Sequence, residues 1–208
     1  MPSRSPFSKA RIAALSGALL IGGSLAAAAA PVSAQGGLLC NGLQVTLVVP
    51  AGGAPFDGTD GDDVILGTNG RDIINARKGN DTICGLGERD IIRGAAGADY
   101  INGGGGPDGL FGGDGNDTMI GGDGWDRLAG GSGRDSMDGG QGNDTMLGQG
   151  WADFMIGGAG SDFLKGGPAD DELIGGAGAD ELRGVGGMDR CSDTSATTIH
   201  GGCEIRNF

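Results

Sequence analysis

The chain has 208 residues, 49 of them glycine, and its 27 acidic residues outnumber 14 basic ones to give a formal net charge of −13. So acidic a surface disfavours nucleic acid and anionic membranes as partners. A glycine-rich acidic chain is ordinarily disordered, because it has little apolar surface to offset the lost chain entropy. Here the acidic residues are periodic, so bound cations can supply the missing stabilisation.

Residues 1–34 have the features of a secretory signal peptide. Three basic residues, Arg4, Lys9 and Arg11, precede an alanine-rich apolar run over 12–30, and small residues end the segment at Ala34. A membrane anchor is the competing interpretation, but glycines and alanines make the run weakly hydrophobic. We predict cleavage after Ala34 and a secreted, extracellular mature chain, cell-surface associated or free, with no transmembrane anchor. Its 11 basic and 27 acidic residues give a formal charge of −16.

The mature chain divides into three segments. Residues 35–57 are a lead-in in which the apolar, β-branched stretch 43–49 predicts a short strand. Residues 58–192 are a repeat array, and 193–208 are a tail. Because the open ends of a repeat array need caps, we expect the lead-in and the tail to cover its two ends.

The array is one nine-residue phrase repeated fifteen times without insertion or deletion. Position six of every copy is aspartate: Asp63, Asp72, Asp81, Asp90, Asp99, Asp108, Asp117, Asp126, Asp135, Asp144, Asp153, Asp162, Asp171, Asp180 and Asp189. Position eight is apolar in every copy: Ile65, Ile74, Ile83, Ile92, Ile101, Leu110, Met119, Leu128, Met137, Met146, Met155, Leu164, Leu173, Leu182 and Cys191. Two columns that stay in phase over the whole array indicate a repeating fold.

Each repeat reads G-G-x-G-x-D-x-U-x, where U is the apolar position, and the copies over 112–147 fit it best. Glycines at positions one, two and four allow positive φ angles and close backbone approach. Positions seven to nine predict a three-residue strand whose middle side chain points inward. A six-residue turn then separates successive strands, and two repeats, 18 residues, form one coil of an all-β solenoid.

The aspartate column predicts a series of cation sites. Turns on one side of a coil stack directly, so each aspartate can face backbone carbonyls of the turn two repeats away, which gives at most thirteen such pairs. Hard oxygen ligands on flexible glycine turns suit Ca²⁺ better than Mg²⁺ or soft metals. Further oxygens can come from the side chains at position three, which are equally well explained as solvated turn residues. These are Asp60, Asn69, Asp114 and Asp123.

The phrase resembles the RTX, or hemolysin-type, calcium-binding nonapeptide repeat, over about two thirds of the chain. The resemblance implies a right-handed parallel β-roll, a β-solenoid of about fifteen nonapeptide repeats with short capping segments, that holds multiple Ca²⁺ ions at the position-six aspartates. Four copies lack the glycine of position one or position four: Glu88, Trp151 and Ala169 replace the glycine at position four, and Ala76 replaces the one at position one. We predict weaker binding at those turns, in repeats three, four, eleven and thirteen.

All four cysteines lie in the mature chain, and an even number in an exported protein indicates disulfides. Three pairings are possible. We favour Cys40 with Cys84 and Cys191 with Cys203, because each links the array to the non-repeating segment beside it. A zinc site is the weaker alternative, since the spacings are wide and the single His200 has no partner histidine.

No catalytic motif accompanies the repeats. One histidine excludes H-E-x-x-H, G-x-S-x-G does not occur, and no segment has EF-hand spacing. We predict a non-enzymatic, secreted calcium-binding protein with a structural or adhesive role at the cell surface or in the matrix. Its partners besides calcium would be cell-surface polysaccharide or protein, met by outward apolar side chains. These are Phe111, Ile120, Phe154, Ile156, Phe163 and Ile174. The alternative is an accessory module of a polysaccharide-modifying enzyme, or such an enzyme on its own.

Overall fold

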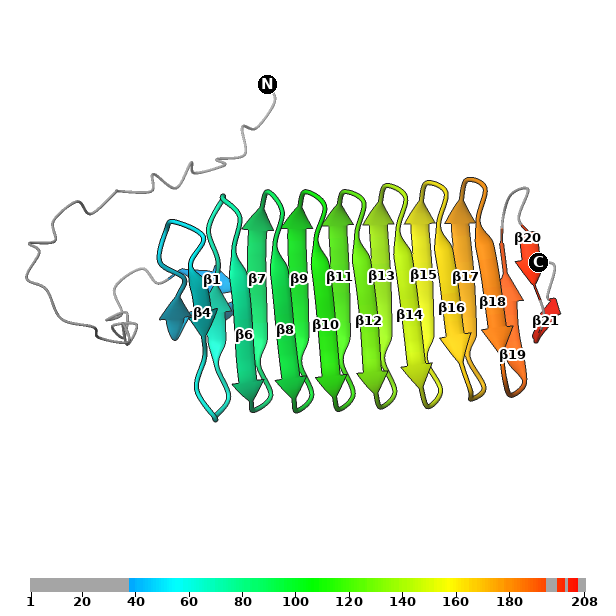
Figure 1. Ribbon diagram of the computed structural model, residues 1–208, viewed down its shortest axis with the longest axis horizontal. Coiled ribbons are helices and arrows are strands. Elements are labelled where there is room, and N and C mark those ends of the chain that lie inside the picture. The colour runs from blue at the N-terminus through cyan, green and yellow to red at the C-terminus, as the bar shows by residue number, and fades with distance from the viewer. Residues whose placement is uncertain (1–37, 194–197, 201, 206–208) are drawn as a thin grey trace, which may run out of the picture.

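The fold is a solenoid of parallel strands whose coils stack along one long axis (Figure 1). A computed structural model describes residues 38–193, 198–200 and 202–205, and no helix occurs among them. Because two repeats form each coil, the solenoid has about 8 turns. The predicted all-β parallel architecture is confirmed.

Two sheets form the two long sides of the solenoid. The nine-stranded sheet contains β4 (Pro55–Asp57), β6 (Ile73–Lys78), β8 (Ile91–Ala96), β10 (Gly109–Asp114), β12 (Arg127–Ser132), β14 (Thr145–Gly150), β16 (Phe163–Gly167), β18 (Glu181–Val185) and β20 (Thr198–His200). The ten-stranded sheet contains β3 (Leu47–Val48), β5 (Val64–Leu66), β7 (Thr82–Gly87), β9 (Tyr100–Gly105), β11 (Thr118–Asp123), β13 (Ser136–Gln141), β15 (Phe154–Ala159), β17 (Glu172–Ala177), β19 (Asp189–Ser192) and β21 (Cys203–Ile205). Consecutive strands alternate between the sheets.

Most strands in the array are six residues long, so the predicted three-residue strand was wrong. A typical strand, β11, joins positions seven to nine of one repeat to positions one to three of the next. Glycines at positions one and two lie within the strands, and those at position two pair across the sheet, as Gly122 does with Gly140. Three residues, positions four to six, remain for each turn. The glycines therefore belong to the sheets as well as to the turns.

Period-two alternation places positions six, eight and one inside the solenoid. The side chains at position eight are fully buried and form one continuous apolar cluster along the whole array. Every strand pair keeps them in contact, since Leu110 pairs with Leu128 and Leu128 with Met146. The prediction that position eight forms the core is confirmed, and the aspartates of position six lie beside it.

Positive φ angles occur at positions two and four of the repeats. Glycine is the usual residue at these positions, but seven other residues adopt the same conformation: Arg77, Leu86, Ala95, Gln149 and Val185 at position two, and Glu88 and Trp151 at position four. Each costs about 1–2 kcal/mol relative to a relaxed backbone. The turns that contain Glu88 and Trp151 thus keep the regular backbone despite the missing glycine.

The register of the array extends into the lead-in. Strands β3 and β4 are the first rungs of the two sheets, with Leu47 paired to Ile65 and Phe56 paired to Ile74. The stretch 43–49, predicted as one strand, is divided between β3 and β2 (Leu43–Gln44), and β2 pairs antiparallel with β1 (Leu39–Cys40). A small apolar cluster that contains Cys40 joins this hairpin to the first coils.

Both disulfides have the favoured pairing. Cys40 is bonded to Cys84 and Cys191 to Cys203, and no free cysteine remains among the described residues. Each bond links the array to the segment beside it, as the sequence predicted. At the C-terminal end the last coil is shorter than the others. Strand β21 pairs Ile205 with Cys191, which are closer in sequence than paired residues in the rest of the array.

The predicted signal peptide lies outside the described residues. Within the described ranges the structure contains no helix long and apolar enough to cross a membrane.

Candidate metal centre

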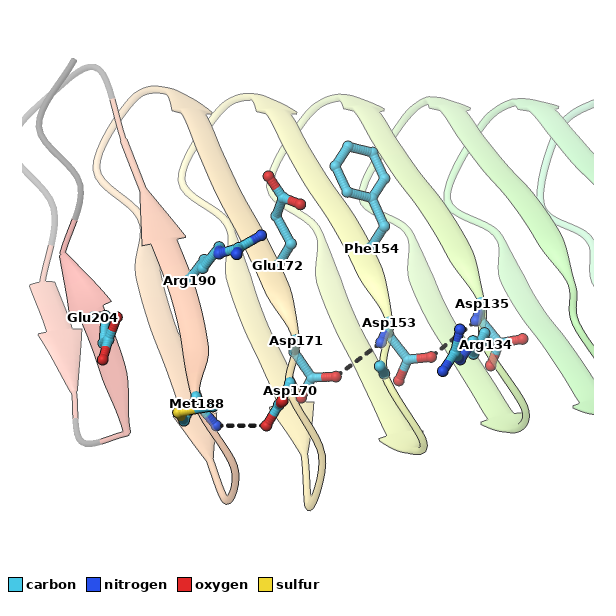
Figure 2. A pocket seen from close by; sticks show the side chains of 11 residues that line it. Arg134, Asp135, Asp153, Phe154, Asp170, Asp171, Glu172, Met188, Arg190 and Glu204 are labelled. Atoms are coloured by element: carbon cyan, nitrogen blue, oxygen red, sulfur yellow. Dashed lines mark hydrogen bonds between the residues drawn. The ribbon is translucent and has the colours of Figure 1, made fainter.

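The position-six aspartates form two buried rows, one in front of each sheet. Thirteen of them accept, at Oδ1, the backbone N–H of the aspartate one coil earlier, over 2.7 to 2.9 Å. Figure 2 shows part of one row, in which Asp171 reaches back to Asp153 and Asp153 to Asp135. The predicted stacking of turns two repeats apart is therefore seen in all thirteen pairs. The contact at Oδ1 is with an N–H group, however, and not with a carbonyl.

The second carboxylate oxygen of these aspartates has no donor. Within the described part of the chain, Oδ2 is buried and without a hydrogen-bond partner in thirteen residues: Asp81, Asp90, Asp99, Asp108, Asp117, Asp126, Asp135, Asp144, Asp153, Asp162, Asp171, Asp180 and Asp189. We call these the ladder aspartates. An unsatisfied buried polar atom costs about 1–3 kcal/mol, and a charged one more. Thirteen such atoms in register need an external partner.

A backbone carbonyl oxygen lies close to Oδ2 at many of these turns. A Cβ atom built on Gly121 would be 2.5 Å from Asp126 Oδ2 and 2.5 Å from the carbonyl oxygen of Gly139. At Gly157 the corresponding distances are 2.6 Å to Asp162 Oδ2 and 2.5 Å to the carbonyl oxygen of Gly175. Position one is thus glycine because these two oxygens leave no room for a side chain.

This donor set fits a hard cation. Carboxylate and carbonyl oxygens meet beside many of the position-one glycines, and such ligands suit Ca²⁺. Among the described residues no group of three or more histidine, cysteine or acidic side chains could hold a metal ion. An ion held here would therefore take one carboxylate oxygen per turn and complete its coordination with backbone oxygens.

The first two aspartates are different, which the sequence analysis did not anticipate. Asp63 Oδ2 accepts the N–H of Thr59 at 2.7 Å and its hydroxyl at 3.0 Å. Asp72 Oδ2 accepts the N–H of Thr68 at 2.6 Å and its hydroxyl at 3.1 Å. Both threonines stand at position two, where most repeats have glycine. In these two turns the chain supplies its own donors to the second carboxylate oxygen.

Burial raises the pKa of every ladder aspartate above the usual 3.8. The backbone N–H bond at Oδ1 acts in the opposite direction, and neighbouring carboxylates raise most of the values further. The pKa reaches about 7 for Asp117 and Asp153. It reaches about 6 for Asp81, Asp90, Asp108, Asp126, Asp144, Asp162 and Asp171. Without a cation, these carboxylates are therefore protonated more readily than an ordinary aspartate.

The predicted position-three ligands lie outside the rows. Asp60 is exposed and forms ion pairs with Arg77 at 3.7 Å and Lys78 at 3.6 Å. Asp123 accepts a hydrogen bond from the side-chain amide of Gln141 at 2.9 Å. The other two residues of this set, Asn69 and Asp114, are also exposed. The structure thus brings the aspartates of position six together and leaves the position-three side chains at the surface.

A second set of side-chain ladders runs through position five. Five residues there accept, at 2.7 to 2.8 Å, the backbone N–H of the position-five residue one coil later: Asp62, Asn80, Asn116, Asn143 and Asp170. The aspartates of position six reach one coil earlier, so the two ladders run in opposite directions. The recurrence of Asn and Asp at position five was the available sequence signal.

The four turns predicted to bind weakly resemble the others in geometry. Asp81, Asp90, Asp153 and Asp171 each keep the Oδ1 hydrogen bond and a buried Oδ2 without a donor. The structure instead separates repeats one and two from the rest. The predicted weakness of those four turns stays a prediction.

Comparison with known families agrees with this geometry. The family model described as RTX calcium-binding nonapeptide repeat matches four times, over residues 57–92, 85–119, 120–150 and 152–189. Each copy spans several nonapeptides, so four matches cover nearly all of the array. A comparison with curated proteins finds no significant match. The chain therefore belongs to the RTX calcium-binding nonapeptide repeat family.

Proposed function

We propose that this calcium-binding repeat protein folds on binding several Ca²⁺ ions, and that the thirteen ladder aspartates hold them. Asp63 and Asp72 serve as a metal-independent start of the roll. The protein acts outside the cell, as a structural or adhesive component of the cell surface or matrix, and has no catalytic role of its own.

The observation that carries the proposal is the buried Oδ2 atom without a donor, repeated in every turn from Asp81 to Asp189. A carbonyl oxygen beside it adds a second acceptor and no proton. Because two acceptors cannot satisfy each other, a cation is the partner that both can share. Binding is then coupled to folding, since the site exists only when successive coils are stacked.

Export is supported by the cysteines. Two disulfides join the array to its end segments, and such bonds persist in oxidising compartments. Extracellular calcium modules bind with dissociation constants of about 10⁻⁴ to 10⁻³ M. Affinity in that range would leave the roll unfolded at low cytoplasmic calcium and fold it after export.

A calcium titration of the chain from Gln35 onward, followed by far-ultraviolet circular dichroism, tests this proposal. We expect a cooperative transition to β-structure at about millimolar Ca²⁺, by analogy with other extracellular modules, and none with Mg²⁺ at the same concentration. A β-rich spectrum that calcium does not change, or a disordered one throughout, would contradict the proposal.

An accessory module of a polysaccharide-modifying enzyme is the second candidate. The observation that favours it is a group of exposed arginine and aromatic side chains on the nine-stranded sheet, including Arg93 and Phe111. Depolymerisation or epimerisation of a uronate polymer by the calcium-loaded chain would establish an enzyme. Binding without turnover would favour a module.

A further inference from the structure

Basic side chains are concentrated on one side of the solenoid. Of the ten Lys and Arg residues in the described part of the chain, eight lie in strands of the nine-stranded sheet or in the turns that lead into them: Arg71, Arg77, Lys78, Arg89, Arg93, Arg127, Lys165 and Arg183. The other two described basic residues belong to the ten-stranded side, Arg134 in the turn that leads into β13 and Arg190 in β19. The basic side chains of this acidic chain are therefore distributed unevenly and favour one face.

Three of these arginines surround exposed aromatic rings. A hollow of about 360 Å³ on this face is lined by Arg89, Arg93 and Arg127 together with Phe111 and Trp125. We call these five residues the arginine–aromatic groove. The Arg93 guanidinium lies 5.3 Å from the centre of the Phe111 ring. Phe111 is 40% exposed and Trp125 is 68% exposed, so both rings are open to solvent.

The arginines of the groove are not neutralised within the protein. Among the described residues, Arg89, Arg93 and Arg127 take part in no ion pair, whereas Arg77, Lys78 and Arg183 do. The acidic residue in the lining, Asp108, is buried in its ladder. Unpaired guanidinium groups remain available for an anionic ligand.

The hollow on the opposite face lacks this character. It is lined by Arg134 and Arg190, but also by Asp170, Glu172 and Glu204 (Figure 2). Acidic side chains there offset the two arginines. The nine-stranded face is thus the side of the molecule on which anion recognition is favourable.

We propose that the arginine–aromatic groove binds an acidic polysaccharide, a chain of sugars that carry carboxylate groups. Guanidinium groups form paired, charge-assisted hydrogen bonds with carboxylates. Exposed aromatic rings attract the weakly positive C–H faces of sugar rings through their negative π face. The groove supplies both kinds of contact side by side.

The spacing of the groove suits an extended polymer. Arg93, Phe111 and Arg127 stand on β8, β10 and β12, which are consecutive strands of the nine-stranded sheet. Strands in a sheet are about 4.8 Å apart, a distance close to the length of one pyranose ring. A sugar chain laid along the solenoid axis can therefore place successive rings over successive strands.

The same charges argue against other polyanions. Nucleic acid carries phosphates at high density, so a bound strand would extend past the groove over the acidic remainder of the surface. An anionic membrane would meet the same repulsion over a larger area. A polysaccharide with one charge per sugar matches three separated arginines better.

Sugar binding in the groove does not depend on which atoms hold calcium, but it requires a folded chain. The experiment is therefore done at saturating calcium, with circular dichroism to verify the β-roll in each variant. A chain that fails to fold with calcium contradicts the proposed function. A folded chain that does not bind sugar contradicts only the groove.

Trp125 can report on binding, because the chain has two tryptophans and the other, Trp151, lies elsewhere on the surface. In a W151F background, a hexamer of galacturonic acid should change the fluorescence of Trp125, while a neutral galactose hexamer should not. Replacing Arg93 and Arg127 with Gln should weaken binding about tenfold or more, given the strength of charge-assisted hydrogen bonds.

The matched control replaces Arg134 and Arg190 with Gln on the opposite face, with the same loss of charge. It should change the affinity by no more than about twofold, because distant exposed charges are largely screened. Equal weakening in both double variants would show general electrostatic attraction and overturn the proposal. Three other results would also overturn it. The hexamer could fail to bind, it could bind through calcium with the same affinity in both double variants and the parent, or oligothymidylate or anionic vesicles could bind more tightly.

Discussion

The first two turns of the array and the thirteen that follow use the same aspartate in different ways. In repeats one and two, Thr59 and Thr68 donate to Oδ2, and the carboxylate is satisfied within its own turn. From Asp81 onward, Oδ1 is tied to the previous coil and Oδ2 has no donor among the described residues. One residue at position two thus distinguishes a self-contained turn from one that needs an ion.

The two exceptional turns lie at the start of the array. The first two aspartates have no position-six aspartate one coil earlier, so their Oδ1 atoms lack the N–H bond that the ladder aspartates accept there. Their Oδ2 atoms are satisfied separately by the threonine at position two, which supplies both an N–H and a hydroxyl, as in side-chain turns and caps. Under the proposed function, these N-terminal turns are an ordered template on which ion-dependent coils stack.

The pH dependence of the metal-free chain should show the largest effect. The raised pKa values mean that the folded ladder binds protons more tightly than the unfolded chain does. The free energy that the protonated ladder contributes to folding without metal is thus fully present below about pH 4 and is lost as the pH rises through about 6 to 7. Circular dichroism in chelator, from about pH 5 to about pH 8, measures the fraction of the chain that stays folded as the ladder loses its protons. Stability that rises with pH in this window would contradict the ladder.

Truncation of a position-eight side chain should lower the free energy of unfolding by the same amount in both regions. Ile74 and Leu128 are both buried in the common core. Replacing either with Ala should lower the free energy of unfolding of the calcium-loaded roll by about 2–5 kcal/mol. Urea unfolding at saturating calcium measures both variants. A much smaller cost for Ile74→Ala would mean that the first coils do not share the cooperative core.

Substituting Asn for Asp should have opposite effects in the two regions. In Asp126→Asn, the amide keeps the acceptor for the Asp108 N–H and places an NH₂ group where Oδ2 meets the Gly139 carbonyl oxygen. The metal-free chain should become more stable at neutral pH by about 1–2 kcal/mol, because a buried unpaired charge is removed. The stabilisation gained from calcium should shrink.

Asp72→Asn is the matched substitution in the first region. There the carboxylate accepts from Thr68, so the metal-free chain should lose about 1 kcal/mol, and the stabilisation gained from calcium should stay unchanged. The calcium concentration at the midpoint of folding, and the pH at the midpoint of folding in chelator, give both quantities for each variant. The same sign in both variants would abolish the distinction between the two regions.

Removal of one hydroxyl should have the smallest effect. Thr68→Val keeps the N–H donor and the side-chain shape but deletes the hydroxyl bond to Asp72. We expect a loss of about 1 kcal/mol, independent of calcium. Urea unfolding measures it, at saturating calcium and in chelator at about pH 5 where the metal-free ladder is protonated, with Thr145→Val in the regular part of the array as the control. A loss that appears only with calcium would indicate an ion at Asp72.

Much of the architecture followed from the repeat. The invariant nine-residue period predicted the parallel solenoid, and position eight predicted the core because only an inward apolar side chain needs to recur in phase. The pairing of Cys40 with Cys84 was predicted from its place beside the first coils. Strand length was predicted wrongly, because glycine is read as a turn residue although Gly122 and Gly140 pair within a sheet.

The candidate site was predicted less completely. The sequence identified the aspartates but not their contacts, since the partner of Asp126 is the backbone of Asp108 in another coil. The missing glycines drew notice in the sequence, whereas Thr59 and Thr68, whose turns differ in the structure, did not. Glu88 and Trp151 adopt the positive φ of the glycines that they replace, so a change of residue there leaves the turn intact.

Periodicity alone was enough to predict the fold and the core, because a strict repeat forces equivalent residues into equivalent places, and it led to the proposal that the aspartate column binds cations. It could not reveal which oxygen of each carboxylate is engaged, or that eight of ten described basic residues lie in one sheet or in the turns that lead into it. Those features depend on contacts between residues a full coil apart. Such contacts exist only once the coils have stacked.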